Sequence, residues 1–336
     1  MKCAKWRKLI SSTVLTRSSQ TLSVVGTNAY IYGGELRSRE PVDSDVHIVD
    51  LRAGSFADRI LSSSTRTTKA PQPRVGSAST ILHGKIYIFS GRGGVAMAPI
   101  EEGGSFWVFD PSGQTWAQIT PENSQLPYPV GRSYHTLASN GKDTIYVHAG
   151  CPEKGRLNDL WAFKVFERKW TELSPAPEPA RGGTSMTFST GKLFRMNGFD
   201  GKNEQGGSLD IFDPLKNAWS TISYCPDGVS GPSARSVSCL LPLVISDRST
   251  LLTMFGEGNP SNLGHQGAGK MLADVWTFDI ESRTWNKVQI EGEELPVARG
   301  WFDADVVQDS PRPCIVVHGG LAESNERLDD LWLLDF

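Results

Sequence analysis

Residues 251–288 read LLTMFGEGNPSNLGHQGAGKMLADVWTFDIESRTWNKV. The outer parts of this stretch recur along the chain, whereas its polar middle, residues 257–271, does not. One apolar run ends at Gly256, a second run (DVWTFD) starts at Asp274, and a Trp-led run starts at Thr284. Short apolar runs bounded by glycine and polar clusters are typical of β-strands. The stretch therefore predicts three strands of one module, and we expect the catalytic or binding residues in its polar insert.

The module occurs six times. The second strand of each copy reads AYIYGGE from Ala29, KIYIFSG from Lys85, TIYVHAG from Thr144, KLFRMNG from Lys192, LLTMFGE from Leu251 and CIVVHGG from Cys314. The third strand reads DVHIVD from Asp45, FWVFD from Phe106, DLWAF from Asp159, LDIFD from Leu209, DVWTFD from Asp274 and DLWLLD from Asp330. A period near 50 residues is typical of propellers with four-stranded blades. The six copies predict an all-β, six-bladed β-propeller.

The two ends of the chain complement each other. The sixth copy stops at Phe336 before its Trp-led strand, and the run KWRKL from Lys5 has the missing pattern. We expect the N-terminal segment to supply the outer strand of the last blade, because closure pairs otherwise free strand edges. Residues 1–336 then form a single domain, with a degenerate fourth strand of the first blade around residues 56–61.

Each copy opens with an arginine followed by small residues. The six are Arg17, Arg74, Arg132, Arg181, Arg235 and Arg299. Together with the glycine pairs and the Trp-led strands, they resemble the Kelch-repeat family over nearly the whole chain. The resemblance implies a Kelch-type propeller, a fold that by itself does not specify function.

The topology places these arginines and the loops between second and third strands at one mouth of the central channel. Loops of unequal length over a rigid scaffold commonly form a ligand pocket. Positive charge repeated in every blade indicates a ligand with an anionic or polarised oxygen. We predict that the catalytic donors are Arg74, Arg132, Arg181, Arg235 and Arg299, and that Arg17 contacts the substrate.

Two aromatic residues near the axis depart from the repeat. Tyr134 and Trp301 stand two residues after their arginines, where the other copies have Ser19, Gly76, Gly183 and Val237. The other nine of the ten tryptophans occupy repeated packing positions. We expect Tyr134 and Trp301 to hold a flat apolar ligand between them. The alternative is that they plug the channel.

The insert carries Glu257, Ser261 and His265 at a spacing of four residues. This pattern resembles the plant specifier proteins, Kelch propellers that direct the breakdown of unstable aglycones released from glucosinolates. In that family a Glu, an Asp and a His at these places hold ferrous iron. Ser261 stands where the family has Asp, and a neutral hydroxyl is a poor iron ligand. We expect Glu257 and His265 to bind substrate, and we expect no metal and no cofactor.

The chain also resembles Kelch-like propellers of fungal natural-product pathways, which direct hetero-Diels–Alder additions of quinone methides to polyenes. That resemblance implies a cofactor-independent pericyclase, or cyclase, of secondary metabolism acting on an aromatic or terpenoid substrate. Near-attack positioning and donation from arginine suit such a reaction. Two alternatives stay open: an iron-dependent lyase of the specifier type and a Kelch protein-interaction module.

The composition narrows the class of partner and the compartment. A net charge of -3 gives no basic field for nucleic acid or for a membrane surface. Five cysteines without a CxxC pair indicate neither a disulfide framework nor a zinc site. The N-terminus lacks the apolar stretch of a signal peptide. We expect a cytoplasmic protein that is a monomer or a weak homo-oligomer.

Overall fold

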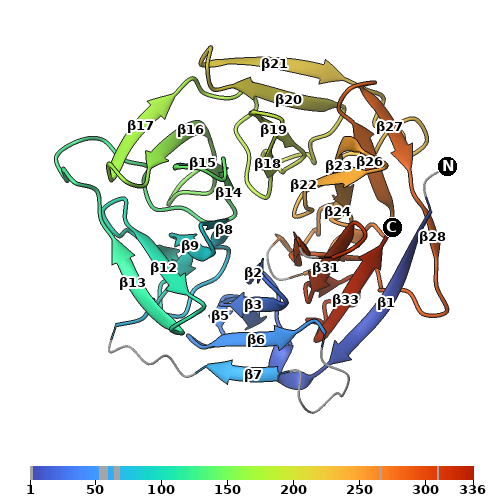
Figure 1. Ribbon diagram of the computed structural model, residues 1–336, viewed down its shortest axis with the longest axis horizontal. Coiled ribbons are helices and arrows are strands. Elements are labelled where there is room, and N and C mark those ends of the chain that lie inside the picture. The colour runs from blue at the N-terminus through green and yellow to red at the C-terminus, as the bar shows by residue number, and fades with distance from the viewer. Residues whose placement is uncertain (1–2, 53–59, 64–68, 265–266, 309) are drawn as a thin grey trace.

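The computed structural model describes residues 3–52, 60–63, 69–264, 267–308 and 310–336. Its main sheets form six blades arranged as a ring around a central axis (Figure 1). In blades one to five the first strand in chain order lies nearest the axis and the last lies at the rim, whereas in blade six the N-terminal strand lies at the rim. The predicted all-β, six-bladed propeller is confirmed.

The first three blades follow one another along the chain. From axis to rim, their strands are β2 (Thr21–Val25), β3 (Asn28–Tyr32), β6 (Val46–Asp50) and β7 (Ile60–Ser63); β8 (Ala78–Leu82), β9 (Lys85–Phe89), β12 (Phe106–Asp110) and β13 (Thr115–Ile119); and β14 (Thr136–Ser139), β15 (Thr144–Gly150), β16 (Leu157–Lys164) and β17 (Lys169–Leu173). The fourth strand of blade one, predicted around residues 56–61, is β7, and residues 56–59 lie outside the described part.

The last three blades have the same order. Their strands are β18 (Ser185–Ser189), β19 (Lys192–Met196), β20 (Ser208–Asp213) and β21 (Ala218–Ser223); β22 (Leu241–Ile245), β23 (Arg248–Met254), β26 (Val275–Asp279) and β27 (Thr284–Lys287); and β30 (Asp303–Val306), β31 (Cys314–His318), β33 (Asp330–Asp335) and β1 (Cys3–Ser11), with β28 (Gln289–Glu291) added beside β1.

Short strand pairs lie in the loops at one end of the ring. They are β4 (Glu35–Arg37) with β5 (Glu40–Pro41), β10 (Arg92–Gly93) with β11 (Ala98–Pro99), β24 (Glu257–Asn259) with β25 (Lys270–Met271), and β29 (Arg299–Gly300) with β32 (Leu321–Ala322). A 3-10 turn, η1 (Thr13–Leu15), precedes β2. No described helix has the length and apolar character needed to cross a lipid bilayer.

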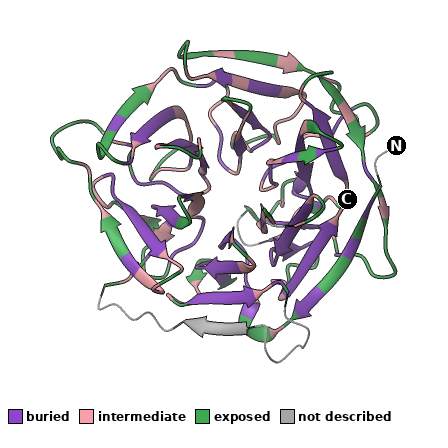
Figure 2. Ribbon diagram, in the orientation of Figure 1, coloured by how far each residue is buried: buried purple, intermediate pink, exposed green. Residues whose placement is uncertain are grey.

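The core lies between neighbouring blades, because each sheet buries both faces against the next (Figure 2). Between blades two and three, Phe106 stacks on Trp170 with ring centroids 5.4 Å apart, and Phe163 lies 4.8 Å from Trp170. The Trp170 indole N–H donates to the carbonyl of Gly104 at 2.8 Å. The Trp-led strands therefore serve packing between blades, as their repetition predicted.

The N-terminal strand β1 closes the ring. It pairs antiparallel with β33, so that Trp6 stands opposite Leu334. Trp6 is 4% exposed, stacks on Phe255 at 5.7 Å and meets Trp332 edge-on at 6.3 Å. The predicted closure of the last blade by the N-terminus is confirmed.

A second closed ring surrounds the axis. Six residues with φ between 46° and 63° form it, each donating its backbone N–H to the carbonyl of the preceding member at 2.7–3.2 Å: Ser19, Gly76, Tyr134, Gly183, Val237 and Trp301. We call these residues the axis ring. Four of the six are not glycine, although side chains disfavour this left-handed conformation. The hydrogen bonds hold them there and fix the origin of the Tyr134 and Trp301 side chains.

Candidate functional site

The arginine that opens each repeat is buried within its blade. We call these six residues the clamp arginines, and each is only 0–3% exposed: Arg17, Arg74, Arg132, Arg181, Arg235 and Arg299. Each donates a guanidinium N–H, at 2.9–3.1 Å, to a carbonyl at or just beyond the end of the second strand of its blade, that of Gly33, Ser90, Ala149, Asn197, Phe255 or Gly319. This bond locks the end of the second strand to the start of the first.

Five clamp arginines also form ion pairs. Their partners, at 2.6–3.2 Å, are Asp43, Glu102, Asp159, Asp274 and Asp330. In four blades the same carboxylate accepts an indole N–H, from Trp107, Trp161, Trp276 or Trp332. Burial favours a raised pKa for Asp330, but hydrogen bonds and charge from Arg299, with the Trp332 N–H, leave that pKa below its usual value.

These contacts overturn one expectation from the sequence. We predicted uncompensated arginine charge at the channel mouth, but five of the six guanidinium groups are neutralised by carboxylates and all six donate to backbone carbonyls. Such groups have few donors left for a ligand. Arg17, Arg74, Arg132, Arg181, Arg235 and Arg299 are therefore placed as blade supports, and neither the donor role nor the substrate contact fits their burial.

Blade four lacks the clamp carboxylate. Arg181 forms no ion pair with any described residue, and its Nε and Nη1 donate to the carbonyls of Pro179 and Asn197. The nearby Asp210 instead pairs with Arg195 at 3.1 Å, inside the blade. Burial, and then the charge of Arg181, lower the pKa of Arg195 to about 9. Blade four thus carries more buried positive charge than its neighbours.

One residue from each blade faces the mouth instead. Directly after the second small residue of each glycine-pair motif come Glu35, Arg92, Cys151, Phe199, Glu257 and Leu321, which we call the entry ring. Each forms a β-bridge with the residue that follows the clamp arginine. Unlike the clamp arginines, these six differ in chemistry from blade to blade. They line two adjoining chambers under the loops.

Tyr134 and Trp301 separate the loop side of the channel from its other end. Both side chains line the two loop chambers and also the cavity along the innermost strands. Gly76 leaves room for the Tyr134 ring, since a Cβ on Gly76 would come within 3.0 Å of it. Burial and the nearby Glu35 carboxylate raise the pKa of Tyr134, so its phenol stays protonated. The two aromatics form a floor under the loop chambers, which fits both a ligand wall and a plug.

The larger loop chamber encloses about 250 Å³ and includes Glu35, Arg92, Met97 and Cys151 in its lining. Arg92 donates to the Ser133 hydroxyl at 2.8 Å and to the carbonyls of Met97 and Pro152 at 3.0 and 2.7 Å. None of the described carboxylates forms an ion pair with Arg92. Its charge is therefore held in place by neutral oxygens and left uncompensated.

The smaller loop chamber encloses about 130 Å³ and shares Tyr134, Cys151 and Trp301 with the larger one. Arg156 enters it from the blade-three loop, with its guanidinium carbon 5.0 Å from the centroid of the Phe199 ring. Within the described ranges no carboxylate pairs with Arg156. Burial raises the pKa of the entry-ring residue Glu257 to about 7, although backbone N–H groups of Gly269 and Ser261 oppose the rise.

The residues that resemble the iron ligands of specifier proteins do not form a ferrous site in the described structure. One Glu257 carboxylate oxygen accepts the Gly269 N–H at 2.7 Å, and the Ser261 hydroxyl accepts the Leu263 N–H at 3.1 Å. His265 lies outside the described residues. Across the described ranges no three His, Cys, Asp or Glu side chains gather as metal ligands. Glu257 and Ser261 organise the insert, and Glu257 also lines the smaller chamber.

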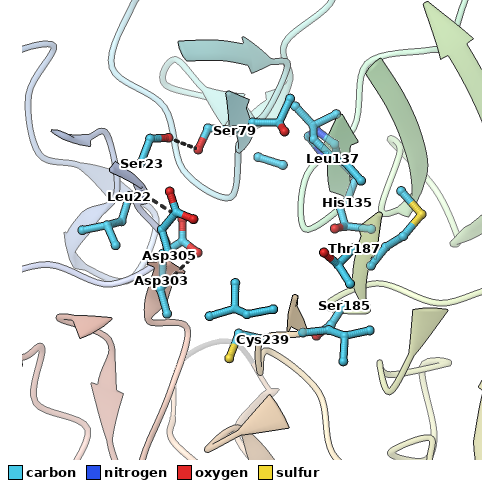
Figure 3. A pocket seen from close by; sticks show the side chains of 18 of the residues that line it. Leu22, Ser23, Ser79, His135, Leu137, Ser185, Thr187, Cys239, Asp303 and Asp305 are labelled. Atoms are coloured by element: carbon cyan, nitrogen blue, oxygen red, sulfur yellow. Dashed lines mark hydrogen bonds between the residues drawn. The ribbon is translucent and has the colours of Figure 1, made fainter. Parts of the chain in front are cut away.

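The cavity along the innermost strands, which we call the channel chamber, encloses about 360 Å³. Its wall is rich in hydroxyls, including the hydrogen-bonded Ser23 and Ser79 (Figure 3). Asp303 and Asp305 accept the backbone N–H groups of Leu22 and Val24 at 2.7 Å, and so join blade six to the inner edge of blade one. Burial raises the pKa of Asp303 to about 7 and that of Asp305 to about 6.

Sequence reasoning missed the residues that shape the loop chambers. The predicted site was based on the charge that repeats in every blade, and it left out Arg92, Arg156 and Phe199, which line these chambers. The sequence does carry a signal for the entry ring. The residue directly after each small-residue pair changes from Glu to Arg, Cys, Phe, Glu and Leu along the six copies, whereas the arginine of each copy does not change. Tyr134, Trp301 and Glu257, which were predicted, do line these chambers.

Comparison with known proteins agrees with this architecture. Residues 19–258 match the family described as the KLHDC2/KLHL20/DRC7 Kelch-repeats domain. The solved structure of YjhT is similar with a TM-score of 0.70 over 96% of this chain and 95% of that one. At 16% identity this likeness shows the fold alone.

Two relatives differ in how much of their own length is matched. The N-(sulfonatooxy)prop-2-enimidothioate sulfolyase of Thlaspi arvense is 24% identical over 94% of this chain and 91% of its own. Tip elongation aberrant protein 1 of Schizosaccharomyces pombe is 28% identical over 59% of this chain but only 17% of its own. The resemblance to plant specifier proteins, read from the sequence, is confirmed by the first of these relatives.

Proposed function

This chain belongs to the Kelch-repeat family of β-propellers, and from the charges in its loop chambers we propose that it is an enzyme acting on a small, labile electrophile there. The substrate carries an anionic or strongly polarised oxygen. The carrying observation is that Arg92 and Arg156 bring positive charge to these chambers without any ion-pairing carboxylate among the described residues. Both arginines are partly buried, and a charge withdrawn from water without a counter-ion is stabilised when an anionic ligand binds beside it.

The chemistry we favour is departure of an oxyanion, directed by the chamber walls. A leaving group that gains negative charge is stabilised by fixed cations, whose orientation costs nothing at the moment of reaction. Arg92 is already held by three hydrogen bonds, so it is preorganised. The relative from Thlaspi arvense, matched nearly end to end, is named as a sulfolyase of a sulfonatooxy compound, which supports this choice.

A cycloaddition is the finer alternative within the same site. The aromatic floor of Tyr134 and Trp301 supports it, because a flat heterodiene stacks on such surfaces. Arg92 or Arg156 would then withdraw electron density from the carbonyl of a quinone methide while the chamber holds a polyene in near-attack geometry. In this version the arginines replace the clamp set as donors.

A turnover assay on two probes separates these versions. Wild type and Arg92→Met are given N-(sulfonatooxy)prop-2-enimidothioate, or an o-quinone methide generated beside a terpene polyene. We expect wild type to release sulfate from the first probe faster than buffer alone, and Arg92→Met to lose at least tenfold of that rate. Acceleration and stereochemical bias with the second probe alone would instead support the cycloaddition. No acceleration of either reaction contradicts the enzyme proposal.

Protein interaction is the second candidate, and one observation favours it. Three loops around the mouth expose apolar side chains, with Leu36 at 50%, Leu263 at 72% and Val95 fully exposed. In relatives such as the fission-yeast protein, similar repeats form a small part of a longer chain. If this role holds, Val95→Asp and Leu263→Asp remove partner binding while small-molecule turnover is unchanged or absent in all variants.

A further inference from the structure

The smaller loop chamber is lined mainly by residues of blades three, four and five, and two ionisable side chains at this place have buried polar atoms without a hydrogen-bond partner in the described structure. Arg156 lies over the Phe199 ring, and its Nε is buried without a hydrogen-bond partner in the described structure. A Cβ on Gly201 would come within 2.8 Å of Nη1, so the glycine leaves room for the guanidinium. The arginine is therefore positioned by packing and not by a counter-ion.

Glu204 is the second unsatisfied group at this place. Both of its carboxylate oxygens are buried, and neither makes a hydrogen bond of normal geometry with a described residue. The backbone fixes its position, since Glu204 bridges Phe199 and the next residue, Gln205, accepts the Arg235 N–H at 3.1 Å. That bond sets Glu204 beside Ser236, a residue that lines the chamber. An ionised carboxylate left in this state is costly.

The groups around Glu204 favour its neutral form. Burial, as the largest effect, raises its pKa to about 8, and the carboxylates of Glu257 and Asp200 act in the same direction. The Ser236 hydroxyl and the Arg156 charge oppose the rise without cancelling it. At neutral pH Glu204 is then a carboxylic acid with an O–H to donate.

We propose that the smaller loop chamber is an oxyanion subsite, in which Arg156 binds one oxygen of the substrate and Ser236, supported by the acid of Glu204, donates to another. This inference rests on the proposed function and names its substrate class: a compound with a sulfate-like or carboxylate group. A volume of about 130 Å³ suits such a group but not a whole substrate. The remainder lies in the larger chamber, across the shared wall of Tyr134, Cys151 and Trp301.

Glu204 is a positioning residue in this scheme, because it acts through Ser236. When neutral, its O–H donates to the Ser236 oxygen, which leaves the serine proton free to point at the ligand. When ionised, it accepts that serine proton and adds negative charge beside the ligand. Anion affinity should therefore fall as pH rises through the pKa of Glu204, by tenfold per unit once the acid is ionised.

Titration calorimetry with sodium sulfate, at constant ionic strength and between pH 6.5 and 9.5, tests the subsite. Wild type should bind sulfate at pH 6.5 and lose affinity above about pH 8. Glu204→Gln should bind within twofold of wild type at pH 6.5 and lose clearly less affinity than wild type by pH 9.5. Its amide donates at every pH, so that only Glu257, whose pKa is raised to about 7, still ionises beside the ligand. Arg156→Met should lose at least tenfold throughout. The exposed Glu153→Gln, in the same loop as Arg156, is the matched control and should behave as wild type.

Several outcomes overturn the inference. These are a wild type that binds no sulfate, an Arg156→Met variant that binds normally, and a Glu204→Gln variant that keeps the wild-type pH dependence. Thermal melting checks that each variant folds. Ser236→Ala, which should weaken sulfate binding at pH 6.5 because it removes the serine donor, replaces Glu204→Gln if that protein does not fold, and normal binding by Ser236→Ala would then overturn the inference. If sulfate binding fails while Arg92→Met still lowers turnover, the proposed function stands without this subsite.

Discussion

The clamp arginines and the entry ring occupy neighbouring positions in every blade, yet they behave in opposite ways. The clamp repeats one residue type six times, buries it and, in five blades, neutralises it with a carboxylate. The entry ring changes from Glu to Arg, Cys, Phe, Glu and Leu and lines the loop chambers. Six-fold repetition therefore marks what holds the blades, and its absence marks where a ligand can be recognised.

Opening the ring should have the largest effect on stability and would show how far the scaffold supports the chambers. Deleting residues 1–10 removes Trp6 and Leu9, which are 4% and 5% exposed. Burying each such side chain contributes about 1.5–3 kcal/mol. We expect the free energy of unfolding to fall by several kcal/mol, measured by chemical denaturation. A truncated protein with the wild-type melting temperature contradicts closure by β1.

Two substitutions compare the stability contributed by a clamp arginine that pairs with a carboxylate and by one that does not. Arg299→Leu leaves Asp330 buried without its counter-ion, which typically costs about 3–5 kcal/mol. Arg181→Leu strands no carboxylate and relieves repulsion with Arg195, so it should cost clearly less. Urea unfolding of both variants gives the ranking. The clamp interpretation fails if Arg299→Leu is the milder change or if it abolishes activity in a fully stable protein.

Changing the chamber arginines should leave stability nearly intact and remove function. Arg156→Met keeps the packing on Phe199 but removes the charge. We expect a loss of at least tenfold in turnover, equivalent to about 1.4 kcal/mol, with the melting temperature within a few degrees of wild type. The comparison breaks down if this variant unfolds as early as Arg299→Leu while its folded fraction retains full turnover.

The last of these predictions concerns the pH dependence of stability. The folded-state pKa of Glu204 is raised from its ordinary value of 4.5 to about 8, so the folded protein binds this proton more tightly than the unfolded chain. Stability from this group is complete below pH 4.5 and declines as pH rises towards 8. Glu204→Gln should flatten that decline in urea unfolding at pH 5 and pH 9. An unchanged pH slope places Glu204 in water or in an ion pair.

The fold could be predicted from sequence because each blade repeats the same strands, and because KWRKL at Lys5 supplies what the sixth copy lacks. The site could be predicted only in part. Tyr134 and Trp301 were predicted as departures from a repeat, and Glu257 from its resemblance to an iron ligand of plant specifier proteins; all three line the loop chambers. The arginines were misread because a buried ion pair depends on where the acid lies. Asp330 follows Arg299 by 31 residues, and only the pairing of strands brings the two together.

Glu204 shows a further limit of prediction from sequence. Nothing in its sequence neighbours predicts a carboxylate without a partner, because groups that act on its pKa come from other blades: Ser236 and Glu257 from the next one and Arg156 from the preceding one. Similarly, Asp303 and Asp305 follow Trp301 in an ordinary strand pattern, yet they reach the free N–H groups of blade one across the ring closure. Contacts between blades are set by the geometry of the ring and not by any local run of residues.

The central claim is that ligand recognition belongs to the loop chambers and not to the clamp arginines. Crystals of the wild-type protein soaked in sodium selenate, a heavy-atom analogue of sulfate, would locate an anion directly through anomalous scattering at the selenium edge. We predict a selenium peak in the smaller loop chamber, within hydrogen-bond distance of Arg156 and Ser236. A peak beside Arg181 or another clamp arginine, or in the channel chamber, with none between Arg156 and Ser236, would contradict the claim.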